Sequence, residues 1–231
     1  MNFSASLAGT NKARRRRVWR AGCLAGLIAL STIAAVAQDV RKSGQPENVF
    51  TYPAKLSLDL RRVAVLPLAP CSAASDLSEG CAALDPVLFE QLVKAKRFET
   101  VAVDPVALRS ATGQTSWTGG EKLPADFLGF LRREYDCDAV LFVELTSYRA
   151  YAPMAIGWRL KLADARSGQI IWAADEVFDA AQPEIYSASQ KFAGQKVKWH
   201  VWHQENWLAA NSPRLFGAYS AAALLDTLPE R

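Results

Sequence analysis

The sequence predicts an α/β protein, with a mixed β-sheet of about five strands flanked by helices. Two features of the pattern predict this class. In residues 61–135, short apolar runs alternate with segments of helical spacing, which is typical of strands joined through helices. In residues 138–178, three strand-like segments follow one another, which indicates an antiparallel meander. Two helical segments come last, so the predicted order is β-α-β-α-α-β-β-β-α-α.

Two helix starts are marked in the alternating half of the chain. Asp85-Pro86 and Asp104-Pro105 each place an aspartate at the N-cap and a proline at the first helical position. The predicted elements of this half are a strand over residues 61–68, a loop over 71–81, a helix over 85–97, a strand over 98–103, a helix over 105–110 and an amphipathic helix over 124–135.

The meander has a middle strand with two different faces. Its alternate residues from Ile156 to Leu162 are apolar and point one way, whereas Arg159 and Lys161 point the other way, towards water. Gly168 takes a positive φ in the hairpin turn that follows. The predicted elements of this half are strands over residues 138–145, 156–163 and 169–178, a turn over 165–168, and helices over 182–192 and 213–228.

Residues 1–37 have the pattern of a secretory signal peptide. Lys12, Arg14–Arg17 and Arg20 precede an apolar run that ends in Ala35-Val36-Ala37, so we predict cleavage after Ala37. The run has 17 residues, and an uncleaved inner-membrane anchor is therefore the alternative. We predict residues 38–60 to be a linker and residues 61–231 to be a single α/β domain. The export signal places the protein in the periplasm or at the outer membrane.

The positive charge of the chain belongs to this leader. It carries six of the 27 Lys and Arg residues and no acidic residue, which leaves 21 cations against 23 Asp and Glu, a net charge of −2. Such a balance gives no attraction for a phosphate backbone. Together with export, it excludes nucleic acid as the expected partner.

Three cysteines follow the leader, at Cys71, Cys81 and Cys137. In an oxidising compartment, a disulfide between Cys71 and Cys81 would close the short loop between them. The alternative is that all three thiols are free, with Cys137 serving as a small buried residue.

Few residues could support catalysis. His200 and His203 stand three positions apart and could bind a metal ion if they lie on a helix, which is the basis for an alternative reading as a metal-dependent hydrolase. Their spacing lacks the His-Glu-x-x-His arrangement that puts two ligands and a base on one helix face. Asp175, Glu176 and Asp179 form an acidic cluster that we interpret as a solvated strand end. We therefore expect no catalytic residue, no metal and no cofactor.

Residues 196–207 combine amphipathic aromatic rings with cations. Such a mixture is typical of a membrane–water interface or of the centre of a protein–protein contact. The alternative is that the rings cover the sheet and fill the core. The candidate surface residues are Lys196, Lys198, Trp199, Trp202 and Trp207.

Three segments resemble a known family. Residues 61–68 (RRVAVLPL) are similar to its first strand, residues 136–145 (DCDAVLFVEL) to its ADAVLxGxL strand, and residues 162–172 (LADARSGQIIW) to its L-x-DAxTGxxLW hairpin. The pattern is found in bacterial envelope proteins of the CsgG, LpoB and PelC type, which share the fold of the TolB amino-terminal domain.

This resemblance implies a function without catalysis. It implies an exported, non-enzymatic protein that binds another envelope protein and supports assembly or transport at the cell envelope. The alternative that it implies is a homo-oligomeric subunit of an outer-membrane secretion complex. The family mostly carries a lipid-attachment motif, from which this chain departs.

Overall fold

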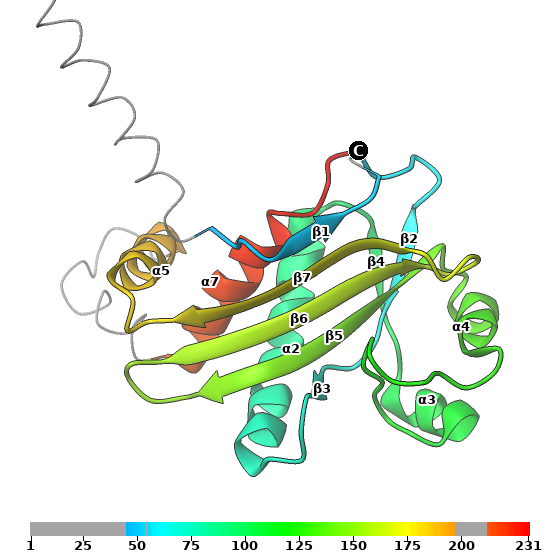
Figure 1. Ribbon diagram of the computed structural model, residues 1–231, viewed down its shortest axis with the longest axis horizontal. Coiled ribbons are helices and arrows are strands. Elements are labelled where there is room, and N and C mark those ends of the chain that lie inside the picture. Colours follow the sequence, from blue (N-terminus) through cyan, green and yellow to red (C-terminus); the bar gives the residue numbers. More distant parts are fainter. Residues whose placement is uncertain (1–44, 54, 197–211) are drawn as a thin grey trace, which may run out of the picture. The chain divides into compact units, whose positions relative to one another are not determined.

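The computed structural model describes residues 45–53, 55–196 and 212–231. They form a seven-stranded sheet flanked by helices (Figure 1). The strands are β1 (Val49–Thr51), β2 (Arg62–Val65), β3 (Ala69–Pro70), β4 (Glu99–Ala102), β5 (Ala139–Arg149), β6 (Ala155–Asp164) and β7 (Ile170–Asp179). The helices are α2 (Ser75–Ala95), α3 (Pro105–Thr112), α4 (Phe127–Tyr135), α5 (Pro183–Lys196) and α7 (Pro213–Leu225).

The sheet is mixed, with the strand order β1-β7-β6-β5-β2-β4 and with β3 beside β5. β2 pairs in parallel with β4 and β5, because helical crossovers join these strands. β5, β6, β7 and β1 pair antiparallel. The predicted α/β class with a mixed sheet is confirmed. The structure adds the short strands β1 and β3 to the strands that the sequence predicts.

One face of the sheet holds the larger core. The alternate residues of β6 from Ile156 to Leu162 point to this face and are fully buried, as the sequence predicts. They pack in one cluster with apolar side chains of α2 and α7, which lie behind the strands in Figure 1. Arg159 and Lys161 lie on the other face and stay partly exposed. Burial of this apolar stripe is the main force that holds these helices to the sheet.

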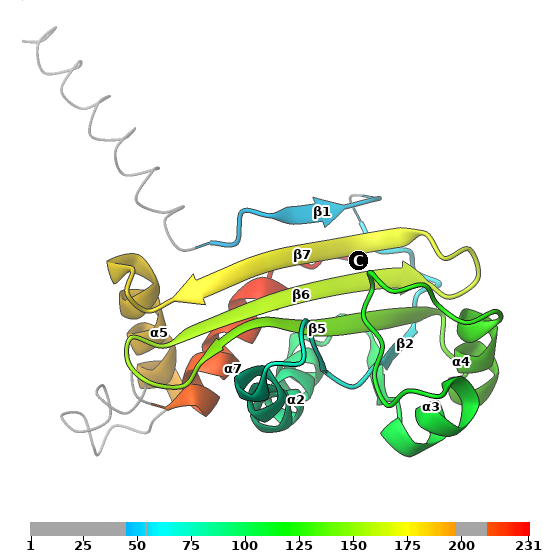
Figure 2. The same ribbon diagram turned by 60° about the horizontal axis from the view of Figure 1, so that its bottom comes forward.

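The other face of the sheet is covered only in part. α3, α4 and the segment between them cover Val140, Phe142 and Ala163 at one end of the sheet. The rings of Trp117 and Phe127 meet edge to face in this smaller core, with their centroids 5.6 Å apart. Figure 2 shows α3 and α4 at one end of the strands, whereas α5, at the other end, packs with α7 in the larger core, so on the face of the smaller core no described helix lies over the middle of β6 and β7.

The start of α2 differs from the prediction. Residues 75–81 are helical rather than part of a loop, and Pro86 lies inside the helix. Asp85 does not cap a helix start; its Oδ1 accepts a hydrogen bond from the backbone N–H of Leu68 at 2.8 Å. The helix begins earlier because residues at helical spacing on both sides of Pro86 are buried against the sheet. These residues are Leu77, Cys81, Leu84, Leu88 and Leu92.

The linker predicted for residues 38–60 is wrong for the part that the structure describes. Val49–Thr51 form strand β1 on the edge of the sheet, beside β7. Leu56 and Leu60 are buried in the larger core, and the N–H of Leu56 donates to the carbonyl of Glu230 at 2.9 Å. Leu58 between them is 75 % exposed, so the alternation of leucines over residues 56–60 does not mark a strand, and the burial of Leu56 and Leu60 comes from tertiary packing.

Two local predictions are confirmed. Asp104 caps α3 by accepting a hydrogen bond from the N–H of Val106 at 3.0 Å. Gly168 has φ +73° in the turn between β6 and β7. Both features depend only on neighbouring residues, which is why short sequence patterns predict them. None of the described helices is long and apolar enough to cross a membrane.

The predicted disulfide is not formed in the structure. Cys71, Cys81 and Cys137 are all free thiols, of which Cys71 is exposed and the other two are buried. The segment between Cys71 and Cys81 is not the loop that the prediction assumed, because most of it is the start of α2.

Candidate functional site

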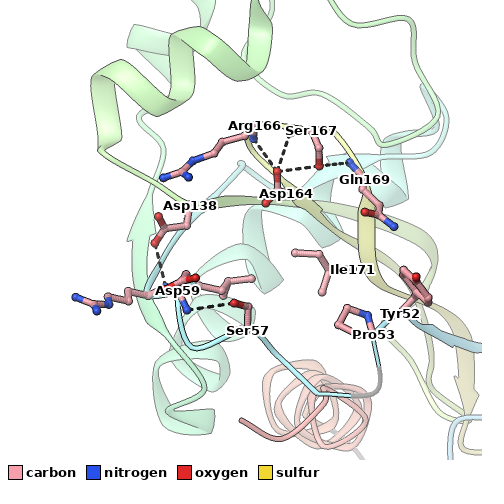
Figure 3. A pocket seen from close by; sticks show the side chains of 12 residues that line it. Tyr52, Pro53, Ser57, Asp59, Asp138, Asp164, Arg166, Ser167, Gln169 and Ile171 are labelled. Atoms are coloured by element: carbon pink, nitrogen blue, oxygen red, sulfur yellow. Dashed lines mark hydrogen bonds between the residues drawn. The ribbon is translucent and has the colours of Figure 1, made fainter.

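A cavity lies at the end of the sheet where β2 and β5 begin (Figure 3). Its volume is about 620 Å³, within the range of small-molecule sites. The segment before β2, the residue before β5 and the turn between β6 and β7 form its walls. The lining residues include Tyr52, Pro53, Ser57, Asp59, Arg61, Asp138, Asp164, Arg166, Ser167, Gln169 and Ile171.

Asp138 holds two strands together at this cavity. Its Oδ2 accepts hydrogen bonds from the backbone N–H groups of Arg61 at 2.9 Å and Arg62 at 3.1 Å. Because Asp138 directly precedes β5 and these N–H groups stand at the start of β2, the carboxylate fixes the register of the two parallel strands. This carboxylate therefore has a structural role.

Asp164 shapes the turn between β6 and β7. Its Oδ1 accepts hydrogen bonds from the N–H of Arg166 at 2.9 Å, the N–H of Ser167 at 2.7 Å and the hydroxyl of Ser167 at 2.9 Å. Burial alone would raise the pKa of Asp164, but these hydrogen bonds outweigh it and lower the pKa below its usual value. A carboxylate with a lowered pKa is a weak general base, so this pair does not activate Ser167 as a nucleophile.

The remaining polar groups of the cavity give no catalytic arrangement. The Ser57 hydroxyl oxygen accepts a hydrogen bond from the N–H of Asp59 at 3.2 Å, which shapes the local chain. Arg61 and Arg166 stand at the rim with exposed side chains. In the described part of the chain, no three His, Cys, Asp or Glu side chains converge as a metal site would require. The cavity offers binding surface rather than a reacting pair.

A second cavity of about 490 Å³ lies at the carboxyl ends of β2 and β4. The middle of α2 and the start of α3 line it from opposite faces of the sheet, and the carboxyl ends of strands are where α/β proteins commonly bind ligands. Its walls are largely apolar, and its two carboxylates both bind backbone. Asp85 accepts from the N–H of Leu68, and Asp104 caps α3. Both carboxylates that line this cavity therefore hold the protein's own backbone, and neither is placed to orient a ligand.

The part of the sheet that no described helix of the smaller core covers is a third candidate binding site, and it is more exposed than the two cavities. We define the open sheet face as Phe50, Glu144, Arg159, Asp175 and Val177. The strand pairing places them on one side, because Phe50 faces Ala173, Glu144 faces Arg159 and Arg159 faces Asp175. Phe50 is 53 % exposed and Val177 is 47 % exposed. The face thus presents apolar side chains around a charged centre.

Arg159 organises the charges of this face. Its Nε lies 2.7 Å from Asp175 Oδ2, and its Nη1 lies 3.2 Å from Glu144 Oε1. The hydrogen bond to Asp175 is the main reason why the pKa of Arg159 is raised, so the guanidinium stays charged. Arg149 and Asp179 form a second ion pair, at 2.8 Å, further along the same strands. Arg149 and Asp179 balance each other, whereas Arg159 and its two carboxylates keep one net negative charge, so the face carries fixed charges.

The acidic cluster predicted at the end of β7 is divided among separate partners. Asp175 and Asp179 form the two ion pairs described above, and Glu176 accepts a hydrogen bond from the N–H of Glu47 at 2.9 Å. All three carboxylates stay partly exposed, as expected for a solvated edge, and each of them also binds a neighbouring group. Alternation along β7 sends Glu176 to the side opposite the other two.

The predicted surface over residues 196–207 is not described by the structure, apart from the backbone of Lys196 at the end of α5. Lys198, Trp199, Trp202, Trp207, His200 and His203 lie outside the described residues. The alternation along β6 predicts Arg159 on the wet face, but it does not identify the partners of this side chain. Glu144 could have been found only by pairing β5 with β6 in the correct register, which no local pattern fixes.

Comparisons with known proteins give matches to solved structures only. No family model matches the chain, and no curated protein matches it. The PelC dodecamer from Paraburkholderia phytofirmans is 14 % identical, with a TM-score of 0.41, and the match covers 79 % of this chain and 96 % of that one.

Two further matches cover about half of this chain. The lipoprotein GNA1162 from Neisseria meningitidis is 18 % identical, with a TM-score of 0.36, over 51 % of this chain and 79 % of that one. The LpoB C-terminal domain from Escherichia coli is 16 % identical, with a TM-score of 0.32, over 51 % of this chain and 82 % of that one. PelC and LpoB are also two of the envelope proteins that the three sequence segments resemble.

Proposed function

We propose that this chain is an exported, non-enzymatic envelope protein that binds another protein through the open sheet face. The observation that carries the proposal is this face, which exposes Phe50 and Val177 around the ion pairs of Arg159. Apolar side chains beside well-ordered charges are typical of protein-binding surfaces. The secretory pattern of residues 1–37 supports binding in the periplasm or at the outer membrane.

The chemistry of the cavities supports binding over catalysis. The carboxylates Asp85, Asp104, Asp138 and Asp164 all accept hydrogen bonds from backbone N–H groups. A carboxylate used in this way holds chain segments together, and for Asp164 these hydrogen bonds also lower the pKa. The described residues around the cavities therefore favour a role in recognition, in agreement with the non-enzymatic function implied by the sequence resemblance.

A photo-crosslinking amino acid at position 177 tests the proposal in the native envelope. A matched control places the same amino acid at Val93, which is 51 % exposed on α2, on the opposite side of the sheet. We expect a specific adduct with another envelope protein from position 177 and none from position 93. No adduct from position 177, or equal adducts from both positions, would contradict binding through this face.

The mass of the adduct separates two forms of the proposal. An adduct with a different protein supports an assembly or transport partner. An adduct with the mass of two copies of this chain supports the alternative, a subunit of an oligomeric secretion complex. Replacing Arg159 by Ala should weaken either adduct, because Asp175 would then face the partner without its cation and the buried Glu144 would lose its ion pair.

A further inference from the structure

The two edges of the sheet differ in how they are protected from pairing with another strand. β4 forms one edge and begins with the exposed Glu99, whose Oε1 lies 3.6 Å from Arg62 Nε. Charged side chains at an edge discourage the approach of another strand. β1 forms the other edge, and residues 48–53 (NVFTYP) carry no charge. In Figure 2, β1 is the upper margin of the sheet, and no described helix or strand lies beyond it.

The hydrogen bonds between β1 and β7 extend past the three residues of β1. The N–H of Asp175 donates to the carbonyl of Asn48 at 3.0 Å, and the N–H of Tyr52 donates to the carbonyl of Ile171 at 2.8 Å. The edge that pairs with β7 therefore covers residues 48–52, which is close to the usual length of a strand.

The same bonds show which backbone groups of this edge point away from the sheet. Backbone groups alternate in direction along a strand, so Phe50 binds β7, whereas the N–H and carbonyl groups of Val49 and Thr51 point outwards. Within the described residues, one of these four outward groups has a hydrogen bond, because the N–H of Val49 donates to the carbonyl of Glu47 at 3.1 Å. The edge thus offers the N–H of Thr51 as a donor and two carbonyls as acceptors.

The outward groups of two copies complement each other. When two such edges run antiparallel about a twofold axis at Phe50, Val49 of each copy faces Thr51 of the other, and each Thr51 N–H can donate to a Val49 carbonyl. The two Phe50 residues then form a pair without hydrogen bonds, with their Cα atoms about 4.5 Å apart. Phe50 is 53 % exposed, and an aromatic pair of this kind stabilises antiparallel strands. No like charges meet in this arrangement, because the segment is uncharged.

We propose that two copies of this chain pair through β1 and join their two sheets into one. The pairing deepens the proposed function, because it sets the open sheet faces of two copies side by side. It rests on the β1 edge and on a second copy of the chain, and it does not require the proposed partner. Only five residues of each copy pair, so the interface is small and the dimer should dissociate on dilution.

A cysteine at position 50 tests the register of the pairing. Phe50→Cys, in a Cys71→Ser background that removes the exposed thiol, should form a disulfide between two copies under oxidised glutathione, because a Cα separation of about 4.5 Å permits the bond. Tyr52→Cys in the same background is the matched control, since Tyr52 is 59 % exposed and the pairing offsets its two copies by about 14 Å along the strands. We expect disulfide formation at position 50 to be at least about tenfold faster. Equal rates, or no disulfide at position 50, would overturn the proposal.

Sedimentation equilibrium of the purified protein measures the association without an introduced cysteine. We expect the mass of one copy in dilute solution and of two copies in concentrated solution. Thr51→Pro removes the outward N–H and no bond to β7, so it should raise the Kd at least about tenfold, whereas Thr51→Val keeps the N–H and should not. The Tm of both variants checks that the domain stays folded. An unchanged Kd in Thr51→Pro, one copy at every concentration, or a mass above two copies would overturn the pairing.

Failure of this pairing and failure of the proposed function give different results. Position 177 lies four residues along β7 from Ala173, which faces Phe50, so it stands about 13 Å from the twofold axis along the strands. The pairing therefore yields no self-adduct at position 177. The adduct in the native envelope tests the open sheet face, and the purified chain alone tests β1.

Discussion

Replacing Trp172 by Ala should strongly destabilise the domain. Trp172 is fully buried on β7, in the larger core. Its Nε1–H donates to Thr227 Oγ1 at 3.2 Å, just beyond the end of α7. The indole therefore connects the sheet to the last helix, and its removal leaves a cavity between them.

The size of the effect follows from burial. Truncating a buried Trp to Ala costs about 3–5 kcal/mol of unfolding free energy. Loss of the hydrogen bond adds little, because Thr227 Oγ1 still donates to the carbonyl of Leu224 at 2.6 Å and is not left without a partner. For a domain of this size, each kcal/mol lowers the Tm by about 2–4 °C, so we expect a fall of about 6–20 °C.

Thermal and urea unfolding followed by circular dichroism would measure the change. Tyr151→Ala is the matched control, because Tyr151 is 84 % exposed and its truncation should change stability by about 0.5 kcal/mol or less. Trp172→Phe should lie between the two, since it keeps much of the ring volume. A Tm for Trp172→Ala equal to that of Tyr151→Ala would refute the assignment of this ring to the core.

The remaining predictions concern glycine packing, alkaline stability and the tryptophan-rich segment. Gly80→Ala should lower stability by about 1–3 kcal/mol, because its Cβ would stand 2.6 Å from Tyr148 Cγ, whereas Gly194→Ala in α5, with open space around it, should be neutral or stabilising in the same unfolding assay. Burial is the main reason why the folded state raises the pKa of Cys81 from 9.0 to about 12. The unfolded chain therefore loses this proton first, and the free energy of unfolding should fall as pH rises above 9. The same measurement on Cys81→Ala should show a smaller fall. Trp202→Ala should weaken partner or membrane association in a co-sedimentation assay while leaving Tm nearly unchanged, and alanine at both histidines should matter little; large, equal losses of Tm in both variants would instead place the segment in the core.

The sequence by itself determined the features that depend on neighbouring residues. The alternation in β6 predicted which side chains are buried, because successive residues of a strand point to opposite faces. Asp104-Pro105 predicted the start of α3, because an aspartate side chain caps the helix and proline lacks the N–H that would need a partner. The order of strands and helices, read in this way, was sufficient for the α/β class.

Only the tertiary structure decided the features that depend on distant residues. Asp85-Pro86 has the same local signal as Asp104-Pro105, yet it lies inside α2, because burial of Leu77 and Leu84 against the sheet extends the helix past it. The open sheet face likewise needs β5, β6 and β7 in register before Arg159 meets its two carboxylates. Register and helix docking are set by the sum of many long-range contacts, and a local pattern carries no record of that sum.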